Sequence, residues 1–318
     1  MLFRPRRVAE ALLRLFAILI APLLRAMAMR GIGSEQFLAR GVLPVPLHFY
    51  QPIFDPGKLP QSVWRRKTEL PGINFDPAGQ LAFLAHLADF AAECAWPEHA
   101  TGDDKYYCQN PSFGYSSACL LHCVVRRFAP KTVIEVGAGM STLVLSDAMD
   151  ANERESGHRG DLVTIDPYPT PTVQAISPTK RRLIAAEVQA TSPHEFAKLG
   201  AGDLLFIDSS HVVRTGGDVN FLYLDVLPRL ASGVVVHIHD IQLPYEYHRA
   251  YSAPGSRAGF YWTEQYLLQA FLALNSVFRV LLAGYWAQLD HSVRFAELFP
   301  TWRPSEHRPT TSFYMQRC

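Results

Sequence analysis

The sequence predicts an α/β fold built around a mostly parallel, doubly wound sheet, and three observations carry this prediction. Beyond residue 130, short apolar runs rich in β-branched residues alternate with helical stretches. This alternation is typical of strands joined by right-handed crossovers. A glycine turn, "EVGAGMS", directly follows the first run, and Asp166, Asp208 and Asp240 each stand where a later run ends.

The elements can be justified in chain order. Strands are expected within 131–136, 161–165, 181–190, 203–207, 232–241, 277–286 and 311–317, with helices within 141–151 and 261–274. Upstream, Asp76-Pro77 is a good start for a helix over 76–94. A further helix runs from Ser116 or Ser117 to Arg127 and is stopped by Pro130.

Length and composition set the domain organisation. The 318 residues suit one large domain with extensions or two small domains. We expect a basic apolar helix over 1–30, an extension over 31–115 on the lid and substrate side, and a domain over 116–318. Within the extension, residues 31–75 are rich in proline and aromatics, which predicts irregular chain.

Charge and cysteine usage exclude some classes of protein. The formal net charge is +1, so no global electrostatic argument for nucleic acid exists. The five cysteines are scattered with no CxxC, which favours a reducing compartment and thus the cytoplasm. The oligomeric state is not indicated by the sequence.

The N-terminal thirty residues carry six arginines and one glutamate around the apolar run Leu15 to Leu24. That run is shorter than the roughly 20 residues that span a bilayer, and no convincing signal-peptide cleavage site follows it. Two interpretations remain open. The helix lies in a membrane interface, giving peripheral contact at the inner face of the membrane, or it covers the domain as an amphipathic helix.

The glycine turn predicts a binding site for a nucleoside ligand. Gly137 and Gly139 let the chain turn sharply and let a ligand approach the backbone. Asp166, at the end of the next strand, can accept hydrogen bonds from both hydroxyls of a ribose. A dinucleotide site would carry a third glycine, but Thr142 holds that position, and Glu135 would repel a pyrophosphate.

With these features, "EVGAGMS" resembles the cofactor motif of class I S-adenosylmethionine-dependent methyltransferases. The resemblance implies a Rossmann-like fold with a seven-stranded, mostly parallel sheet, one antiparallel strand supplied by 311–317, and helices on both faces. It also implies that S-adenosylmethionine is the cofactor. Glu135, Gly137, Gly139, Ser141 and Asp166 would bind it. "FGYSSA" corresponds to a lid, so Tyr115 and Ser117 are candidate cofactor contacts, with helix-capping and packing roles as the alternative.

Carboxylates and imidazoles gather where the fourth and fifth strands end. Asp208 and His211 follow one strand, and His239 and Asp240 follow the other. Parallel strands present their carboxyl ends at one edge, so the four side chains should meet. A hydroxyl acceptor needs deprotonation before methyl transfer, which a divalent cation and a neutral imidazole both assist. Strand-end aspartates that merely cap a helix are the alternative.

The "IDSSH" segment resembles metal-dependent sugar O-methyltransferases of macrolide antibiotics. That resemblance implies that Asp208 binds Mg²⁺ or Mn²⁺ and that His211 is the base. The acidic pair of that family reads His239-Asp240 here, so Asp240 carries over directly. His239 would shift the metal preference toward Mn²⁺, Fe²⁺ or Zn²⁺, or orient a ligand from behind.

Outer motifs extend the likeness to uncharacterised bacterial class I methyltransferases over about residues 40–318. Among these motifs, "HDIQLPYEYHRAY" offers Tyr245, Tyr247 and His248 as contacts to a sugar or aromatic acceptor, with a packed surface loop as the alternative. His237 is expected to point to the opposite face from His239 and to be a packed core or surface histidine with no part in the site.

The sequence thus predicts an O-methyltransferase that acts on a hydroxyl of a saccharide or other small molecule and uses a divalent cation. Three alternatives remain. They are metal-free transfer with His211 acting alone, a nicotinamide-dependent oxidoreductase, and a non-catalytic membrane-associated binding protein.

Overall fold

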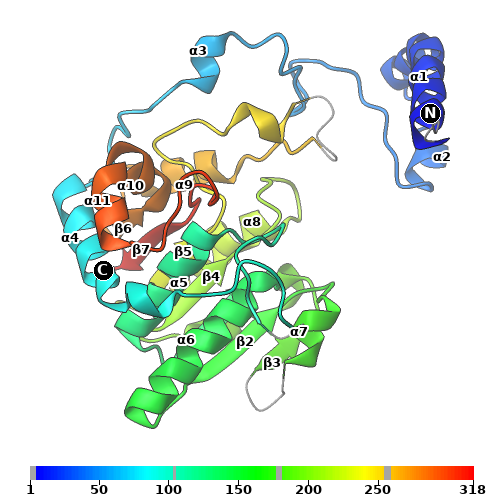
Figure 1. Cartoon of the computed structure of the whole chain (residues 1–318). Coiled ribbons are helices and arrows are strands. Elements are labelled where there is room, and N and C mark those ends of the chain that lie inside the picture. The colour runs from blue at the N-terminus through cyan, green and yellow to red at the C-terminus, as the bar shows by residue number, and fades with distance from the viewer. Residues whose placement is uncertain (1–4, 103–104, 177–180, 254–258) are drawn as a thin grey trace. The chain divides into compact units, whose positions relative to one another are not determined.

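The computed structural model describes residues 5–102, 105–176, 181–253 and 259–318. The chain forms two compact units. One comprises the first 59 residues with 252–261, and the other comprises 60–251 with 262–318. Figure 1 shows the elements of both units.

The larger unit is built on a seven-stranded sheet with the order β3-β2-β1-β4-β5-β7-β6. All pairs among the first five strands are parallel, and β7 is antiparallel to both of its neighbours. The predicted seven strands, including the antiparallel one, are confirmed. Their bounds are β1 Thr132–Val136, β2 Asp161–Ile165, β3 Arg182–Ile184, β4 Leu204–Ile207, β5 Val235–Ile238, β6 Phe278–Ala283 and β7 Phe313–Arg317.

The strand order brings the predicted site residues to one edge. The chain winds outward from β1 to β2 and β3, then returns to place β4 on the other side of β1. The carboxyl ends of β1, β4 and β5 therefore lie side by side at the switch point, where doubly wound sheets bind ligands. All residues of β4 and β5 are buried, as expected for parallel strands covered on both faces.

Helices of the larger unit follow the predicted pattern. α4 begins after Asp76, whose carboxylate accepts a hydrogen bond from the Gly79 N–H at 3.1 Å, and it packs against β6. α5 begins one residue before the predicted start and packs along α6 (Figure 1). The helices of this unit are α3 Gln61–Trp64, α4 Pro77–Leu87, α5 Tyr115–Phe128, α6 Met140–Ser156, α7 Pro171–Ala175, α8 Asp218–Phe221, α9 Glu264–Leu272, α10 Gly284–Asp290 and α11 Ser292–Leu298.

Short turns of tighter or wider helix join these elements. They are Ala88–Glu93, Val188–Ala190, Pro193–Lys198, Leu227–Arg229 and Arg249–Tyr251, with a π-helical turn at Leu222–Val226. The predicted helix over 76–94 thus continues past α4 as a 3₁₀ segment.

The smaller unit contains α1 (Pro5–Arg30) and α2 (Ser34–Leu38). Residues 31–75 were expected to be irregular, and α2 and α3 correct this expectation, although both are too short to have shown a helical period. The N-terminal helix is also longer than the apolar run Leu15–Leu24 indicated. Val8–Arg30, 23 residues with a mean hydropathy of 1.9, is long and apolar enough to cross a membrane.

Candidate functional site

The glycine turn after β1 is fixed against the end of β4. Gly137 has a φ of 84°, and a Cβ there would lie 2.0 Å from the carbonyl oxygen of Asp208. Only glycine fits this position, because the neighbouring atom is backbone and the φ disfavours other residues. Gly139 differs. Its backbone is extended, and a Cβ there would meet nothing within 4 Å.

Glu135 lies beneath this turn, not in contact with a ligand space. Its side chain is fully buried, and its carboxylate accepts hydrogen bonds from the hydroxyls of Ser141 (2.8 Å), Thr142 (2.8 Å) and Thr164 (3.0 Å). Burial raises the pKa of Glu135 to about 7, although the three hydroxyls oppose the shift. Glu135 and Ser141 thus support the turn from behind, and their direct contact with a cofactor stays a prediction.

Asp166 ties the end of β2 to the same turn. One carboxylate oxygen accepts from the Ala138 N–H at 2.7 Å, and the other accepts from the Tyr168 N–H at 2.6 Å. Each oxygen keeps a further lone pair, so the carboxylate remains able to accept from a ligand hydroxyl. Asp166 is thus placed where the sequence predicted.

A cleft of about 390 Å³ opens beside these residues, and we call it the glycine-turn cleft. It is large enough for a small ligand. Glu187, Val188 and Gln189, which follow β3, form part of its wall. The sequence did not indicate this contribution, because β3 is only three residues long. Its lining comprises Val136, Gly137, Ile165, Asp166, Pro167, Tyr168, Glu187, Val188, Gln189, Asp208, Ser209, Ser210, Arg214 and Asp218.

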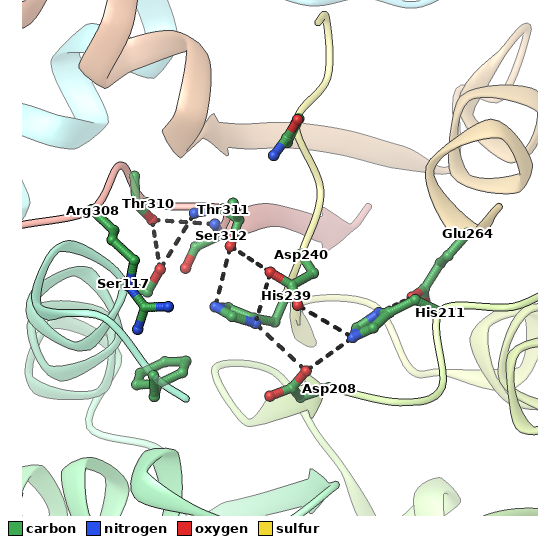
Figure 2. A network of polar contacts seen from close by, with 12 residues as sticks. Ser117, Asp208, His211, His239, Asp240, Glu264, Arg308, Thr310, Thr311 and Ser312 are labelled. Atoms are coloured by element: carbon green, nitrogen blue, oxygen red, sulfur yellow. Dashed lines mark hydrogen bonds and ion pairs between the residues drawn. The ribbon is translucent and has the colours of Figure 1, made fainter. Parts of the chain in front are cut away.

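Two aspartates and two histidines converge at the ends of β4 and β5 (Figure 2). His211 Nε2 lies 3.2 Å from Asp208 Oδ1 and 3.5 Å from Asp240 Oδ2. His239 Nδ1 lies 3.5 Å from Asp208 Oδ1 and 3.6 Å from Asp240 Oδ1. The structure therefore brings together all four predicted residues.

Asp208 does not cap a helix. Its carboxylate accepts no backbone N–H among the described residues, and the neighbouring Ser210 N–H is instead satisfied by Asp218 at 2.8 Å. The capping alternative for Asp208 therefore has no support in the geometry.

Hydrogen bonding fixes which nitrogen of His239 faces the carboxylates. The Thr311 hydroxyl donates to Asp240 Oδ1 at 2.8 Å, so it has only a lone pair left for His239 Nε2, at 3.3 Å. Nε2 therefore carries the proton of a neutral ring. The buried Nδ1, which lacks a hydrogen-bond partner, then directs a lone pair at two carboxylates. A cation between these groups would relieve that repulsion.

His211 is held in the same way by a residue that sequence reasoning missed. Its Nδ1 lies 2.7 Å from Glu264 Oε2, and Glu264 is fully buried at the start of α9. The Glu264 carboxylate accepts a hydrogen bond from His211 Nδ1–H. This bond orients the ring so that Nε2 faces Asp208 and Asp240. The motif "YWTEQ" contained Glu264, but nothing in its spacing tied it to a residue 53 positions earlier.

Two of the four residues adopt an unfavourable backbone. His211 has a φ of 60° and Asp240 a φ of 55°, in the left-handed region, which is uncommon for residues other than glycine, although asparagine, aspartate and histidine are enriched in it. Such strain is concentrated at functional sites.

The charges of the cluster reinforce one another. Burial opposes ionisation of Asp208, yet His239 and His211 hold its pKa well below the usual range. Burial would lower the pKa of His211, but its bonds to Asp208 and Glu264 raise it well above 6.5. The pKa of His239 is also raised, by Asp240 and Asp208 against burial. Without a metal, the imidazoles therefore take up protons where a cation would bind.

The spacing of the cluster fits a transition-metal ion. Ligand atoms about 2.1 Å from a metal lie about 3.0–3.4 Å from one another in octahedral or tetrahedral geometry. The four contacts of 3.2–3.6 Å approach this range. Asp208, His211 and Asp240 form a group in which one ligand atom from each residue lies within 4.8 Å of the other two, and His239 lies outside this group. Two imidazoles favour Mn²⁺, Fe²⁺ or Zn²⁺ over Mg²⁺.

A second cleft, of about 490 Å³, opens on the other side of His239 and Asp240, and we call it the histidine cleft. It has an arginine, Arg308, and two tyrosines in its wall, which suits a polar organic molecule. Its lining comprises Ser112, Gly114, Ser117, His239, Asp240, Gln242, His248, Ala250, Tyr251, Tyr285, Arg308, Pro309 and Thr311.

Three predicted contact residues lie outside both clefts. Tyr115 is buried, bonds Thr301 through its hydroxyl and stacks on His307 with ring centroids 4.1 Å apart. Tyr245 bonds Asp290, and the buried Tyr247 accepts the Gln265 N–H at 3.2 Å. Tyr115 and Tyr247 are packed in the interior and Tyr245 is partly exposed; none of the three lines either cleft, and their contacts with a ligand stay predictions. Aromatic composition alone did not distinguish them from Tyr251, which lines the histidine cleft.

Ser117, His248 and His237 complete the comparison with the sequence. Ser117 and His248 line the histidine cleft, so Ser117 lies away from the predicted cofactor side. His237 is a fully buried core residue, as expected, and stacks on Tyr314. It nevertheless shares a face with His239, with ring centroids 6.1 Å apart, because residues two apart on a strand point the same way.

Residues 134–241 match a family model described as a methyltransferase domain. This stretch begins in β1 and ends just beyond β5, so it contains the glycine turn and all four residues of the cluster. The match supports a methyltransferase of class I, the kind that the glycine turn resembled.

Individual proteins add less. An uncharacterised protein of Archaeoglobus fulgidus is 27% identical over 132 residues, which is 39% of this chain and 58% of that protein. A crystal structure from Thermobifida fusca, provisionally described as a methyltransferase, is 11% identical. It covers 78% of this chain and 96% of its own, with a TM-score of 0.29, an overlap too loose to carry an argument.

Proposed function

We propose that the chain is a class I S-adenosylmethionine-dependent methyltransferase, and more narrowly an O-methyltransferase assisted by a divalent cation; the match of residues 134–241 to a methyltransferase domain supports the first part. The acceptor in this proposal is a small molecule bearing a hydroxyl, such as a saccharide. One observation carries the proposal. Two carboxylates and two imidazoles meet between the glycine-turn cleft and the histidine cleft.

In this proposal one cleft binds the methyl donor and the other binds the acceptor. S-adenosylmethionine would occupy the glycine-turn cleft, with its ribose at Asp166, and would supply the methyl group. The acceptor would occupy the histidine cleft, where His248, Tyr251 and Arg308 stand in the wall. Asp208 lines the first cleft and Asp240 the second. Because methyl transfer requires an in-line approach, this shared boundary is where an acceptor oxygen would be aligned.

Asp208, Asp240 and His239 would hold the cation, since their oxygen and nitrogen atoms face one another without a satisfying partner for His239 Nδ1. A bound divalent cation lowers the pKa of a coordinated hydroxyl. Glu264 fixes the His211 ring so that Nε2 faces the same space. His211 then takes the acceptor proton in this proposal, or serves as a fourth ligand.

Replacement of His211 by asparagine distinguishes these two roles. If His211 is the base, turnover falls at least about 100-fold while the affinity for Mn²⁺, measured by calorimetry, changes little. If His211 is a ligand, the affinity for Mn²⁺ falls with turnover.

Metal-free transfer is the second candidate, and a specific observation favours it. His211 Nε2 lies between the carboxylates of Asp208 and Asp240, which would stabilise the imidazolium formed when a neutral His211 takes the acceptor proton without a cation. Chelation separates the two. Activity that survives exhaustive treatment with EDTA, and does not rise when Mn²⁺ is returned, rules out the role of the metal.

The class of cofactor is tested by calorimetry on the purified chain. We expect S-adenosylhomocysteine to bind and NADH not to bind. Binding of NADH with no heat from S-adenosylhomocysteine would support an oxidoreductase instead. Binding of S-adenosylhomocysteine without turnover on any hydroxyl acceptor would favour a non-catalytic binding protein.

A further inference from the structure

α1 carries a large apolar surface that the other described residues of the smaller unit do not cover. Eight of its large apolar side chains are each more than half exposed, namely Leu12, Leu13, Leu15, Phe16, Ile18, Leu19, Leu23 and Met29. Soluble proteins rarely leave so much contiguous apolar surface in water, and such a surface marks a place of contact with another phase or molecule.

Three charged residues in the body of α1, Glu10, Arg14 and Arg25, share one side of the helix, whereas Arg30 at its end points about 160° from Arg14. Arg14 and Arg25 are both exposed and lie eleven residues apart. At about 100° per residue they point within about 20° of each other. Glu10 lies about 40° from Arg14 by the same geometry. These three charges therefore form a narrow stripe, and the rest of the circumference between residues 8 and 29 is apolar.

This stripe decides how the helix meets a bilayer. The ten residues between Arg14 and Arg25 extend about 15 Å, half the roughly 30 Å of hydrocarbon that a spanning helix crosses. A spanning orientation would place both arginines in the hydrocarbon, at a considerable cost for each. A helix in the plane of the surface keeps both among the headgroups and buries the apolar side chains.

A second feature of the same unit fits a lipid surface. Phe49 and Tyr50 are 81% and 82% exposed, and their ring centroids lie 4.3 Å apart. Aromatic rings with polar atoms are favoured at the boundary between headgroups and hydrocarbon.

We propose that α1 binds the surface of an anionic bilayer, lying in its plane with Arg14 and Arg25 among the headgroups. This surface role is separate from the methyl-transfer site and stands or falls without it. The occupant is a membrane and not a partner protein, because a stripe of arginines along an otherwise apolar helix complements acidic headgroups above acyl chains.

Flotation of the full chain with lipid vesicles tests the proposal, since floating separates bound protein from aggregates. We expect the chain to float with vesicles of phosphatidylcholine and phosphatidylglycerol, and to float much less with phosphatidylcholine alone. High salt should weaken the binding to anionic vesicles. Alkaline carbonate should release the protein from them.

Charge reversal at both arginines, R14E with R25E, should lower the vesicle partition coefficient at least about 25-fold, from about fivefold for each arginine removed. F16E with L23E should abolish flotation. Matched controls in the larger unit are R127E on α5 and V293E on α11, where Val293 is 74% exposed, and both should float like the parent chain. Circular dichroism verifies that each variant is folded.

Three results would overturn the proposal. These are no flotation of the parent chain, flotation that ignores lipid charge and the arginine replacements, and retention in the membrane after carbonate treatment. The last would show a spanning helix.

Discussion

At the scale of single residues, Asp240 combines a strained backbone with a carboxylate that faces both imidazoles. Its φ of 55° persists although it opposes folding. Its neighbours explain why, because Thr311 and the two histidines all contact its carboxylate. We interpret the strain as the cost of aiming this group at the boundary between the two clefts.

Asp240→Asn separates the chemistry from the fold. Asparagine tolerates the left-handed region as aspartate does, so the free energy of unfolding should change by no more than about 1 kcal/mol. The affinity for Mn²⁺ should fall at least about tenfold, because a charged ligand is lost. Calorimetry and urea unfolding measure the two quantities. Asp225→Asn, at an exposed ion pair with Arg229, is the control. A large loss of stability would instead make Asp240 structural.

The two histidines predict how pH affects metal binding. Their pKa values are raised in the metal-free protein, so the protonated rings contribute stability below about 6.5, and this contribution is lost as pH rises through the raised values. A cation must displace these protons. We therefore expect the affinity for Mn²⁺ to rise with pH above 6.5, with protons released on binding.

Titration calorimetry in two buffers of different ionisation enthalpy counts those protons. Glu264→Gln should reduce the number released near neutral pH, because it removes a carboxylate that raises the pKa of His211. Metal binding without proton release at neutral pH would contradict this account.

At the scale of elements, the turn between β1 and α6 is the part of the site most tightly determined by packing. Gly137 is enclosed by the backbone of Asp208, whereas Gly139 faces open space. Packing and backbone conformation thus require glycine at position 137, whereas neither requires it at position 139.

Gly137→Ala should cost several kcal/mol of unfolding free energy, about 1 from the positive φ and more from overlap with a carbonyl oxygen. Gly139→Ala should leave stability within about 1 kcal/mol. Urea unfolding of the pair checks both. Equal stability of the two variants would mean that β4 does not pack on the turn as described.

Glu135 beneath the turn predicts a second dependence on pH. Its folded pKa is about 7, above the reference value of 4.5, so the folded state binds a proton that the unfolded state has lost between these values. Stability should therefore fall as pH rises through this window, by about 3 kcal/mol in total. Glu135→Gln should flatten this fall in urea unfolding at several pH values. An unchanged slope would show that Glu135 is ionised throughout.

The sequence allowed prediction of the strands, because each is a short apolar run bounded by turns and crossovers fix their direction. It also brought Asp208, His211, His239 and Asp240 together, since all four follow strands that end at one edge. It could not place Glu264 or Arg308, which reach the site from segments far along the chain. It did not indicate that Tyr115, Tyr245 and Tyr247 lie outside both clefts, because the place of an aromatic ring depends on packing that composition does not show.

At the scale of the whole molecule, the site arises from topology. Placing β4 beside β1 brings the end of β4 against the glycine turn, and placing β5 next to β4 adds His239 and Asp240. Asp208 lines the glycine-turn cleft, and His239 and Asp240 line the histidine cleft, so the cluster has members in the walls of both, whereas His211 is buried and lines neither. A donor and an acceptor held in these clefts would face each other across the four side chains.

A crystal structure of the chain grown with S-adenosylhomocysteine and Mn²⁺ tests this arrangement most directly. Anomalous scattering should locate manganese within about 2.0–2.3 Å of atoms from Asp208, Asp240 and His239. The ribose should lie at Asp166, and the sulfur should point toward the cluster. Manganese elsewhere, or a ligand whose sulfur points away from Asp208, would contradict the account.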